Sequence, residues 1–310
     1  MSRILITGVT GKSGLYFLKR LSQDVSFCDK NEFTFIIHSE SKIDTVRDYN
    51  ISSTCVTGDL EDAEFLKKLF SENQFDVLLH IAGPRLTPLL AKTAINCGTK
   101  RLILVHTTGI YSKYKRAAQI YVKKEKELRD MLCGKNIALT ILRPTMIYGD
   151  LNDRNISKFI TMVDKLRIFP VVDHAKYELQ PVHAKDLGDA YYSVLTHPEE
   201  TSNKEYNLSG GAPIKLIDML LVIGGYLNKR NTFISVPFWL AYSIAFVLWC
   251  LTFGAIDYRE KVQRLVEPRV FSYDDAQRDF GYSPVSFQQG VKDEVQMYID
   301  RQTAGKVYTV

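Results

Sequence analysis

The sequence predicts an α/β fold, a Rossmann-like doubly wound parallel sheet with a smaller C-terminal substrate region. Short apolar runs alternate with helical patterns over the first half of the chain, which is the rhythm of a parallel sheet covered by helices. A glycine-rich turn also separates the first apolar run from the first helical pattern, as in a dinucleotide-binding turn. We therefore place a Rossmann domain at residues 1–150, with a returning segment at 177–208, and the substrate region at 151–176 and 209–310.

The first element is an apolar strand at residues 3–7, followed by the turn and by a helix at 11–21. The first glycine of the turn permits a sharp reversal, the second lets the backbone approach a pyrophosphate, and the third lets the helix pack closely on the strand. The helix N-terminus adds free N–H groups and the positive end of the helix dipole. We expect the turn to bind the phosphates of a dinucleotide through Gly8, Thr10, Gly11, Lys12, Ser13 and Gly14.

The second strand is predicted at residues 33–38, an apolar run typical of a buried parallel strand. Its end should reach the adenosine ribose, where an acidic residue favours NAD and a basic residue favours the 2′-phosphate of NADP. His38, Ser39 and Lys42 favour NADP, whereas Glu40 can bond a ribose hydroxyl. The sequence therefore favours NADP and leaves NAD as the alternative.

The third and fourth predicted strands also end in residues that suit a dinucleotide. After the strand at 51–57, the carboxylate of Asp59 can accept from the adenine amine while the N–H of Leu60 donates to the ring. After the strand at 75–81, small residues let the backbone lie against the nicotinamide ribose. We expect these contacts from Ile81, Ala82 and Gly83.

Helices predicted at 61–70 and 86–97 lead to a fifth strand at 101–106, and a sixth strand is predicted at 137–142. The C-terminal half continues the alternation of apolar runs and helical patterns. Its predicted elements are a helix at 156–166, a strand at 169–172, a helix at 186–195, a strand at 205–208, and helices at 214–227 and 258–266.

One apolar segment stands out in this half. Residues 231–256 contain no charged residue, and 233–256 are dense in Phe, Trp, Leu, Ile and Val. The length allows a membrane span, but Pro237 and several hydroxyl side chains weaken that interpretation. Three alternatives follow: a buried or lid helix of the substrate region, an interfacial patch lying on a membrane, and a true span.

The composition is that of a globular protein of 310 residues with a net charge of +5 and a sequence pI near 8.8. Its basic residues are scattered or alternate with acidic ones, which predicts no nucleic-acid partner. The five cysteines show no metal-binding spacing, so we expect reduced thiols, no metal site and a cytoplasmic location. Because the first predicted strand begins at residue 3, we expect no signal peptide.

Several motifs along the whole chain resemble those of the extended or atypical short-chain dehydrogenases/reductases, in the NAD-dependent epimerase/dehydratase group. The matching stretches are Thr7-Gly8-x-x-Gly11-x-x-Gly14, Gly58-Asp59-Leu60, Thr107-Thr108-x-x-Tyr111, Leu142-Arg143-Pro144-x-x-Ile147-Tyr148-Gly149, Gln180-Pro181-Val182-His183-x-x-Asp186-Leu187 and Asp279-Phe280-Gly281-Tyr282-Ser283-Pro284.

The resemblance implies a catalytic set made of a hydroxyl residue, a Tyr and a Lys, in which the Tyr acts as general acid/base. Thr107 matches the hydroxyl position and Lys123 the lysine position, where it would support the cofactor ribose. The resemblance also places the turn at Arg143 and Pro144 beside the nicotinamide. Arginines of the C-terminal half would hold a substrate diphosphate, with Arg154, Arg167, Arg264 and Arg269 as candidates.

The chain departs from the family pattern at the tyrosine. The frame that gives Lys123 places Gln119 at the tyrosine position, and a glutamine cannot exchange a proton in a hydride-transfer step. Tyr111 and Tyr114 are the remaining phenols nearby. Thr108 and Gly109 also stand where dehydratases of the family carry Asp-Glu, which disfavours dehydration.

The leading interpretation is an NAD(P)-dependent oxidoreductase or epimerase. Its small-molecule substrate would be a nucleotide sugar or a related polysaccharide or lipid-linked precursor. Peripheral membrane contact through 233–256 and a homodimer are compatible with this interpretation. The alternative, which Gln119 favours, is a catalytically silent NAD(P)-binding sensor or structural subunit.

Overall fold

Seven parallel strands form one central sheet in the order β11-β6-β5-β4-β1-β2-β3. The structure is a computed structural model that describes residues 1–114, 116–153 and 155–307. The strands are β1 (Arg3–Thr7), β2 (Glu32–Ile37), β3 (Ser53–Thr57), β4 (Val77–His80), β5 (Arg101–Val105), β6 (Ala138–Pro144) and β11 (Glu205–Leu208). This order confirms the predicted Rossmann-like sheet.

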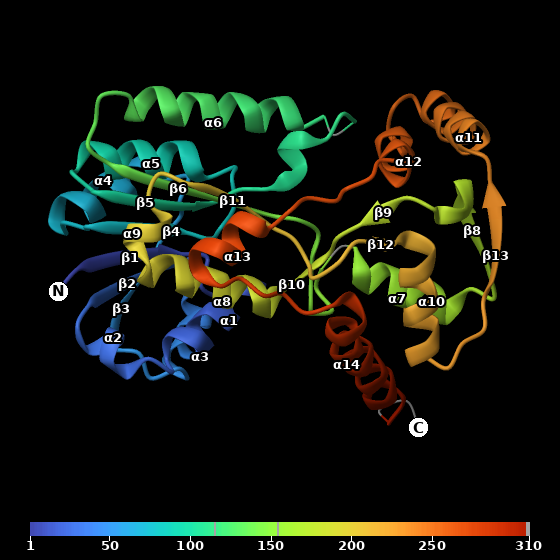
Figure 1. Cartoon of the computed structure of the whole chain (residues 1–310), viewed down its shortest axis with the longest axis horizontal. Helices are drawn as coiled ribbons and strands as arrows, with labels where there is room; N and C mark the ends of the chain where they lie inside the picture. The colour runs from blue at the N-terminus through green and yellow to red at the C-terminus, as the bar shows by residue number, and fades with distance from the viewer. Residues whose placement is uncertain (115, 154, 308–310) are drawn as a thin grey trace.

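Helices cover both faces of the sheet (Figure 1). On one face α1 (Lys12–Leu21) and α8 (Ala184–Thr196) share a core with β1 and β2. The other face carries α4 (Ala63–Glu72), α5 (Thr87–Asn96) and α6 (Ala118–Leu132), with a second core. Short elements not foreseen in the sequence complete this half: α2 (Val25–Asp29), the 3-10 turn η1 (Glu40–Lys42), α3 (Ile43–Arg47), the 3-10 turn η2 (Thr108–Tyr111), α9 (Pro198–Thr201) and α13 (Asp274–Phe280).

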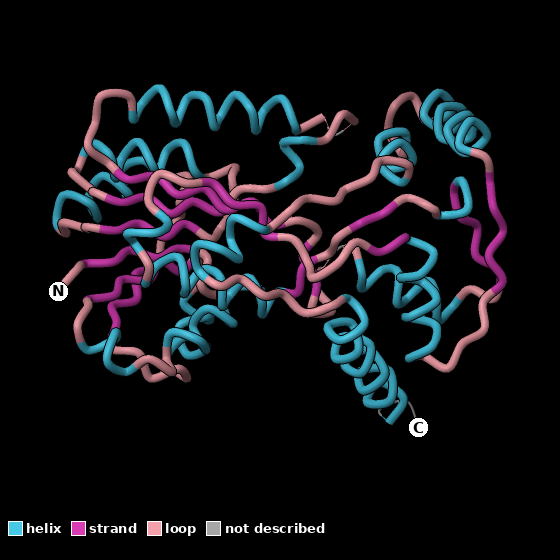
Figure 2. Tube along the Cα trace, viewed as in Figure 1, coloured by secondary structure: helices cyan, strands magenta, loops and turns pink. Residues whose placement is uncertain are grey.

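The C-terminal region forms a separate lobe with a core of its own, beside the carboxyl ends of the strands (Figures 1 and 2). Two-stranded pairs run through it between helices. The pairs are β7 (Ile147–Tyr148) with β10 (Val182–His183), β9 (Glu178–Leu179) with β12 (Ile214–Lys215), and β8 (Ile168–Val172) with β13 (Thr232–Val236). The helices are α7 (Ile156–Lys165), η3 (Asp173–Ala175), α10 (Leu216–Tyr226), α11 (Phe238–Leu251), α12 (Arg259–Leu265) and α14 (Phe287–Val307).

The uncharged segment 231–256 is divided between two elements. Its first part pairs with β8 as β13, because a β-branched and aromatic run suits a strand. Pro237 then caps α11, which has 14 residues. Within the described residues, no helix is long and apolar enough to cross a membrane. The alternative of a buried or lid helix is wrong as to burial, because Ala245 is the one buried residue of α11, and its lid form stays a prediction.

The contact between α1 and α8 allows a test of the packing. A Cβ on Gly188 of α8 would lie 2.6 Å from the backbone of α1 at Phe17. Overpacking of this kind costs about 1–3 kcal/mol. We expect Gly188→Ala to lower the free energy of unfolding by that amount in chemical denaturation.

Gly225 is the matched control, because it also lies in a helix but a Cβ there meets nothing within 4 Å. Gly225→Ala should be neutral or stabilising by up to about 1 kcal/mol. Equal destabilisation by both substitutions would contradict the close packing of α1 on α8.

Candidate functional site

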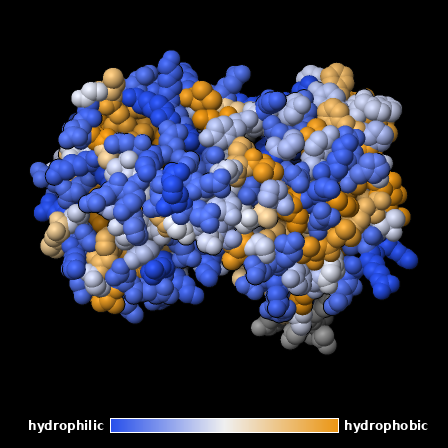
Figure 3. All heavy atoms as spheres, viewed as in Figure 1, coloured by the Kyte–Doolittle hydropathy of each residue, from blue (hydrophilic) through white to orange (hydrophobic). Residues whose placement is uncertain are grey.

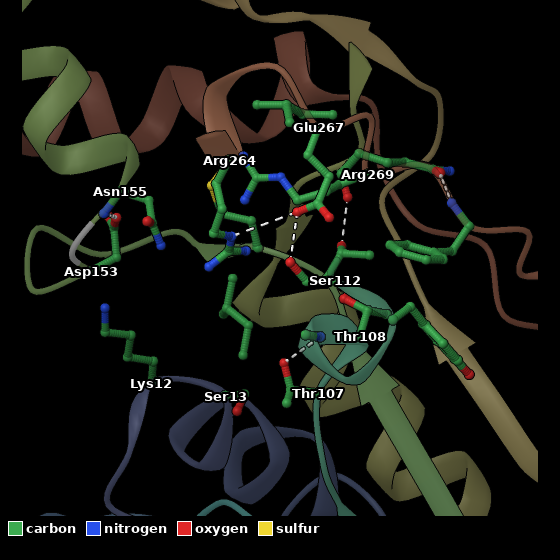
Figure 4. Close-up of a pocket in the computed structure, with 18 of the residues that line it drawn as sticks. Lys12, Ser13, Thr107, Thr108, Ser112, Asp153, Asn155, Arg264, Glu267 and Arg269 are labelled. Atoms are coloured by element: carbon green, nitrogen blue, oxygen red, sulfur yellow. Dashed lines mark hydrogen bonds and ion pairs between the residues drawn. The ribbon is translucent and has the colours of Figure 1, made fainter. Parts of the chain in front are cut away.

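A cleft of about 1110 Å³ lies between the carboxyl ends of the central strands and the C-terminal lobe. The loops after β1, β4, β5 and β6 form its lower wall, and the end of α12 with the residues that follow it forms the upper wall (Figure 4). This is the crevice where open α/β sheets bind ligands. Many residues expected from the sequence line it. They are Gly8, Thr10, Gly11, Lys12, Ser13, Ile81, Ala82, Thr107, Tyr111, Tyr114, Arg264 and Arg269.

The glycine turn has the geometry expected of a phosphate-binding turn. Gly8 adopts φ +81°, and a Cβ there would lie 2.6 Å from the backbone nitrogen of Ala82. A Cβ on Gly14 would lie 2.2 Å from the carbonyl oxygen of Gly8. The turn can therefore form only with glycine at both positions, since any side chain would meet backbone.

The N-terminus of α1 opens into the cleft. Gly11 caps it without a side-chain hydrogen bond, so the first-turn N–H groups can receive an anion. Lys12 points into the cavity from this turn (Figure 4) and forms an ion pair of 3.0 Å with Asp150. A cation and a helix N-terminus thus lie at the same end of the cleft.

The residues expected to bind adenosine lie at the ends of β2 and β3 but outside the lining of this cleft. His38, Ser39 and Lys42 are exposed, and the Ser39 hydroxyl bonds that of Ser41 at 2.9 Å. Asp59 accepts from the backbone N–H of Glu61 at 2.9 Å, which fixes the turn after β3. Leu60 is buried. Gly83, with φ +106°, closes the loop after β4, where its carbonyl oxygen contacts His80 at 3.0 Å.

The loop after β5 brings three of the predicted catalytic side chains to the cleft. Thr107 accepts from the Gly109 N–H at 3.0 Å, and a hydroxyl that accepts can still donate its own proton to a bound oxygen. Tyr111 is half exposed and stacks on Phe271, with ring centroids 5.3 Å apart. Tyr114 is also exposed at the cleft. Two phenols and a hydroxyl therefore share one wall.

The structure corrects the prediction for Lys123. Its side chain is 79% exposed on the outer face of α6 and pairs with Glu127 at 3.8 Å. Gln119 lies exposed on the same outer face. The face of α6 that turns inward carries Ala118, Glu125 and Leu128, so the sequence frame through Lys123 points to solvent rather than to the cofactor.

Arg143 is a second correction, because its guanidinium is buried beneath the cleft. It donates to Glu125 from Nε at 3.1 Å and to Glu205 at 2.8 Å. Burial raises the pKa of Glu125, but hydrogen bonds from His106 and Arg143 outweigh it and hold that pKa at about 2. Pro144 contributes its carbonyl oxygen to the Thr108 hydroxyl at 3.2 Å. Both residues thus support the loop and do not line the cleft.

Arginines form the upper wall of the cleft. Arg264 and Arg269 point into it beside Glu267 (Figure 4). Glu267 accepts from the Ser112 hydroxyl and the Lys113 N–H, each at 2.7 Å. Both arginine Nε atoms are buried without a hydrogen-bond partner among the residues that the structure describes, although that of Arg264 forms an ion pair with Glu267 at 3.9 Å. Arg167 is outside this lining, and Arg154 lies outside the described residues.

Burial, with the charge of Arg264 nearby, lowers the pKa of Arg269 to about 10. This lowered pKa indicates that the Arg269 guanidinium lacks a full counter-charge. An anionic group in the cleft would supply that charge.

A buried carboxyl pair escaped the sequence analysis. Asp153 lines the cleft and accepts from the N–H groups of Asn155 and Ser157, at 2.6 and 3.0 Å. Behind it lies Glu294 of α14, which is fully buried and accepts from the Gly149 N–H at 2.9 Å. Burial and the neighbouring Asp153 raise the pKa of Glu294 to about 10. The only sequence signal was a charged residue on the apolar face of a helix.

Comparison with known proteins agrees with this geometry. A model of the NAD(P)H-binding family matches residues 8–198. UDP-glucose 4-epimerase of Vibrio cholerae is 22% identical over 68% of this chain and 66% of its own length. The chloroplast stem-loop binding protein of 41 kDa b of Arabidopsis thaliana is 26% identical over 67% of this chain, which spans 58% of that protein.

Solved structures share the fold along nearly the whole chain. UDP-glucose 4-epimerase of Thermotoga maritima, solved with UDP-glucose, superposes with a TM-score of 0.70 at 15% identity, covering 97% of this chain and 99% of that one. dTDP-glucose 4,6-dehydratase of Bacillus anthracis, in complex with NAD, gives 0.70 at 14% identity and 97% of both chains. These matches confirm the predicted resemblance to the epimerase/dehydratase group.

The carboxyl pair predicts a particular pH dependence. The pKa of Glu294 rises from 4.5 in the unfolded chain to about 10 in the folded one. Its stabilising contribution is complete below about pH 4.5 and is lost as the pH rises toward 10. Between about pH 5 and 9, the free energy of unfolding should fall by at least about 1 kcal/mol more in the natural protein than in Glu294→Gln.

Thermal unfolding across this pH range measures the difference. Asp300→Asn, an exposed carboxylate on the same helix, is the control and should keep the natural slope. If Glu294→Gln retained the natural slope as well, Glu294 would be ionised in the folded protein at neutral pH.

Proposed function

The chain belongs to the NAD(P)H-binding family, and we propose that it is an NAD(P)-dependent oxidoreductase or epimerase. Its proposed substrate is a nucleotide sugar or a related polysaccharide or lipid-linked precursor. The observation that carries the proposal is one continuous cleft, which joins the glycine turn, the hydroxyl and phenols after β5, and two arginines whose buried Nε atoms make no hydrogen bond to a described residue.

The residues at the lower wall fit a nicotinamide dinucleotide. Gly8 and Gly11 line the cleft with backbone alone, and the α1 N-terminus with Lys12 matches a pyrophosphate in charge. Such a cofactor supplies a hydride acceptor or donor when bound. We propose NADP as the preferred form, held at its 2′-phosphate by Ser39 and Lys42, with contributions from His38.

The chain's own residues have the following proposed roles. Thr107 orients the reacting oxygen of the substrate through its hydroxyl, which Gly109 fixes in place. Tyr111 or Tyr114 exchanges the proton. Arg264 and Arg269 bind the anionic part of the substrate, because both have a buried Nε without a hydrogen bond to a described residue and the Arg269 charge lacks a full partner. The nucleotide-sugar class is supported by similar proteins named for UDP-glucose and dTDP-glucose.

The rival function is a silent NAD(P)-binding sensor or structural subunit. The orientation of α6 favours this function. Lys123 faces solvent, and no lysine of this helix is among the described residues that line the cleft. The family pattern assigns the support of the catalytic phenol to a lysine of this helix, and Lys123 does not supply it. The two functions differ in turnover, not in cofactor binding.

The deciding experiment titrates purified protein with NADPH and NADH by nicotinamide fluorescence. UDP-glucose and related nucleotide sugars are then added to the tighter complex. We expect tighter binding of NADPH, followed by cofactor oxidation or by epimerised product. Thr107→Ala should lower turnover by about 100-fold or more while leaving cofactor affinity unchanged.

Tight cofactor binding without turnover on nucleotide or lipid-linked sugars would establish the silent protein instead. If neither cofactor bound, the dinucleotide site itself would be refuted.

The arginine pair makes a separate prediction. Arg269→Gln removes a charge-assisted bond to the substrate, worth about 1.5–3 kcal/mol, and should raise the KM for a nucleotide sugar by roughly 10- to 100-fold. Arg278→Gln, an exposed arginine paired with Asp275 and Asp279 far from the cleft, is the control. Isothermal titration gives the affinities, and an equal loss in both variants would argue against the arginine pair as the substrate site.

A further inference from the structure

Helix α11 presents an apolar face to solvent. Its 14 residues contain no charge, and it packs against α12, with Ala245 buried. The outer face is just as apolar, with Trp239 68% exposed and Phe253 of the following turn fully exposed. The remaining exposed apolar side chains of α11 are Leu240, Ile244, Phe246, Val247 and Leu251.

The exposed face continues beyond the helix. On β8 and β13, which pair in parallel, Ile168 and Ile234 are both more than half exposed. Hydrophobic side chains gather there at the right-hand edge of the molecule, over β13 (Figure 3). Exposed apolar patches of this extent mark a surface that contacts another phase or partner, since each Å² left in water costs about 25 cal/mol.

Basic residues surround this face. Residues 229–264 contain five basic and two acidic residues. Three of the basic side chains, those of Lys229, Arg259 and Arg264, form ion pairs, and both acidic side chains are also engaged. Asp257 pairs with Arg116 and Arg259, and Glu260 accepts from the Arg116 N–H at 3.4 Å. Arg230 and Lys261 are exposed at the two ends of the segment. The rim of the apolar face is therefore positive.

We propose that the α11–α12 hairpin, residues 238–265, docks on a membrane surface that carries anionic lipid headgroups. Helix α11 lies in the plane of the surface with Trp239 and Phe253 in the acyl boundary. At about 1.5 Å per residue it spans roughly 21 Å, too short to cross a hydrocarbon core of about 30 Å but long enough to lie within the interface. Arg230 and Lys261 contact the headgroups.

A bilayer fits this face better than a second copy of the chain. Two copies joined through α11 would bring two positive rims together, and like charges repel. An anionic surface complements the same rim, and exposed aromatic side chains favour the membrane interface.

Intrinsic fluorescence gives a direct test, because the chain has two tryptophans, Trp239 and Trp249, and both belong to α11. Full-length protein is mixed with vesicles of phosphatidylcholine containing about 30% phosphatidylglycerol, and with phosphatidylcholine vesicles alone. We expect a blue shift and co-sedimentation with the anionic vesicles. Both should weaken when salt rises from about 0.1 to 0.5 M. Trp249→Phe, which leaves Trp239 as the single reporter, should keep the shift.

Matched variants distinguish docking through α11 from nonspecific adsorption of exposed apolar residues to vesicles. Ile244→Glu with Val247→Glu charges the outer face of α11 and should weaken vesicle binding by at least about tenfold. Ile120→Glu with Val122→Glu changes two equally exposed residues of α6 and should leave binding unchanged. Unchanged thermal unfolding confirms that each variant folds.

Three results would overturn the proposal. The first is the absence of a blue shift with either kind of vesicle. The second is equal loss of binding in the α6 control. The third is a dimer in light scattering that Ile244→Glu with Val247→Glu dissociates while vesicles have no effect, which would assign the face to a second copy. None of these results bears on cofactor binding or turnover, so the enzyme proposal is tested independently.

Discussion

The buried ion pair between Glu125 and Arg143 is the constraint on which the candidate site depends. It joins α6 to β6, and Arg143 extends the contact to Glu205 at the start of β11. Glu125 also contacts His106 at 2.8 Å, immediately before the Thr107 loop. Removing one partner would leave an uncompensated charge in the core, at a cost of about 3–5 kcal/mol. The pair therefore fixes both the rotation of α6 and the position of the loop after β5.

That rotation decides which chemistry the cleft can offer. With Glu125 facing inward, Lys123 and Gln119 are turned to solvent. The positive charges that line the cleft come instead from Lys12 of the glycine turn, from Lys113 on the loop after β5, and from Arg264 and Arg269 of the opposite lobe. These cations match phosphates better than they match a catalytic phenol, because guanidinium groups bind phosphate oxygens through paired N–H donors. The cleft therefore contains more of the groups needed to bind an anionic substrate than of those needed for proton exchange.

The fold could be predicted because its signals are local. Each sheet strand is a short apolar run, and the glycine turn specifies its own geometry through Gly8 and Gly14. The sequence predictions were wrong or incomplete where residues remote in sequence determine how a side chain is oriented or which strand it pairs with. The inner face of α6 carries the charged residue Glu125, so hydrophobic periodicity could not identify that face. The spacing of the family motif instead selected Lys123, two residues earlier, which lies on the outer face. Glu294 lies 145 residues from its partner Gly149, a distance at which sequence spacing carries no information. Residues 232–236 were assigned to one apolar segment because their strand partner, β8, is also remote in sequence.

The apolar face of α11 and the upper wall of the cleft are connected by one short stretch of chain, α12 and the residues that follow it. Helix α12 follows α11 and ends at the arginines of the upper wall, and Glu267 then holds Ser112 and the Lys113 N–H on the loop after β5. Arg116, just beyond that loop, reaches back to Asp257 between the two helices. Because the hairpin is tied at both points to the wall that bears Thr107, anything that holds α11 in place also holds the spacing between the arginines and the hydroxyl. Burial of α11 against an external surface would thereby narrow the range of substrate poses in the cleft, even though no residue of α11 lines it.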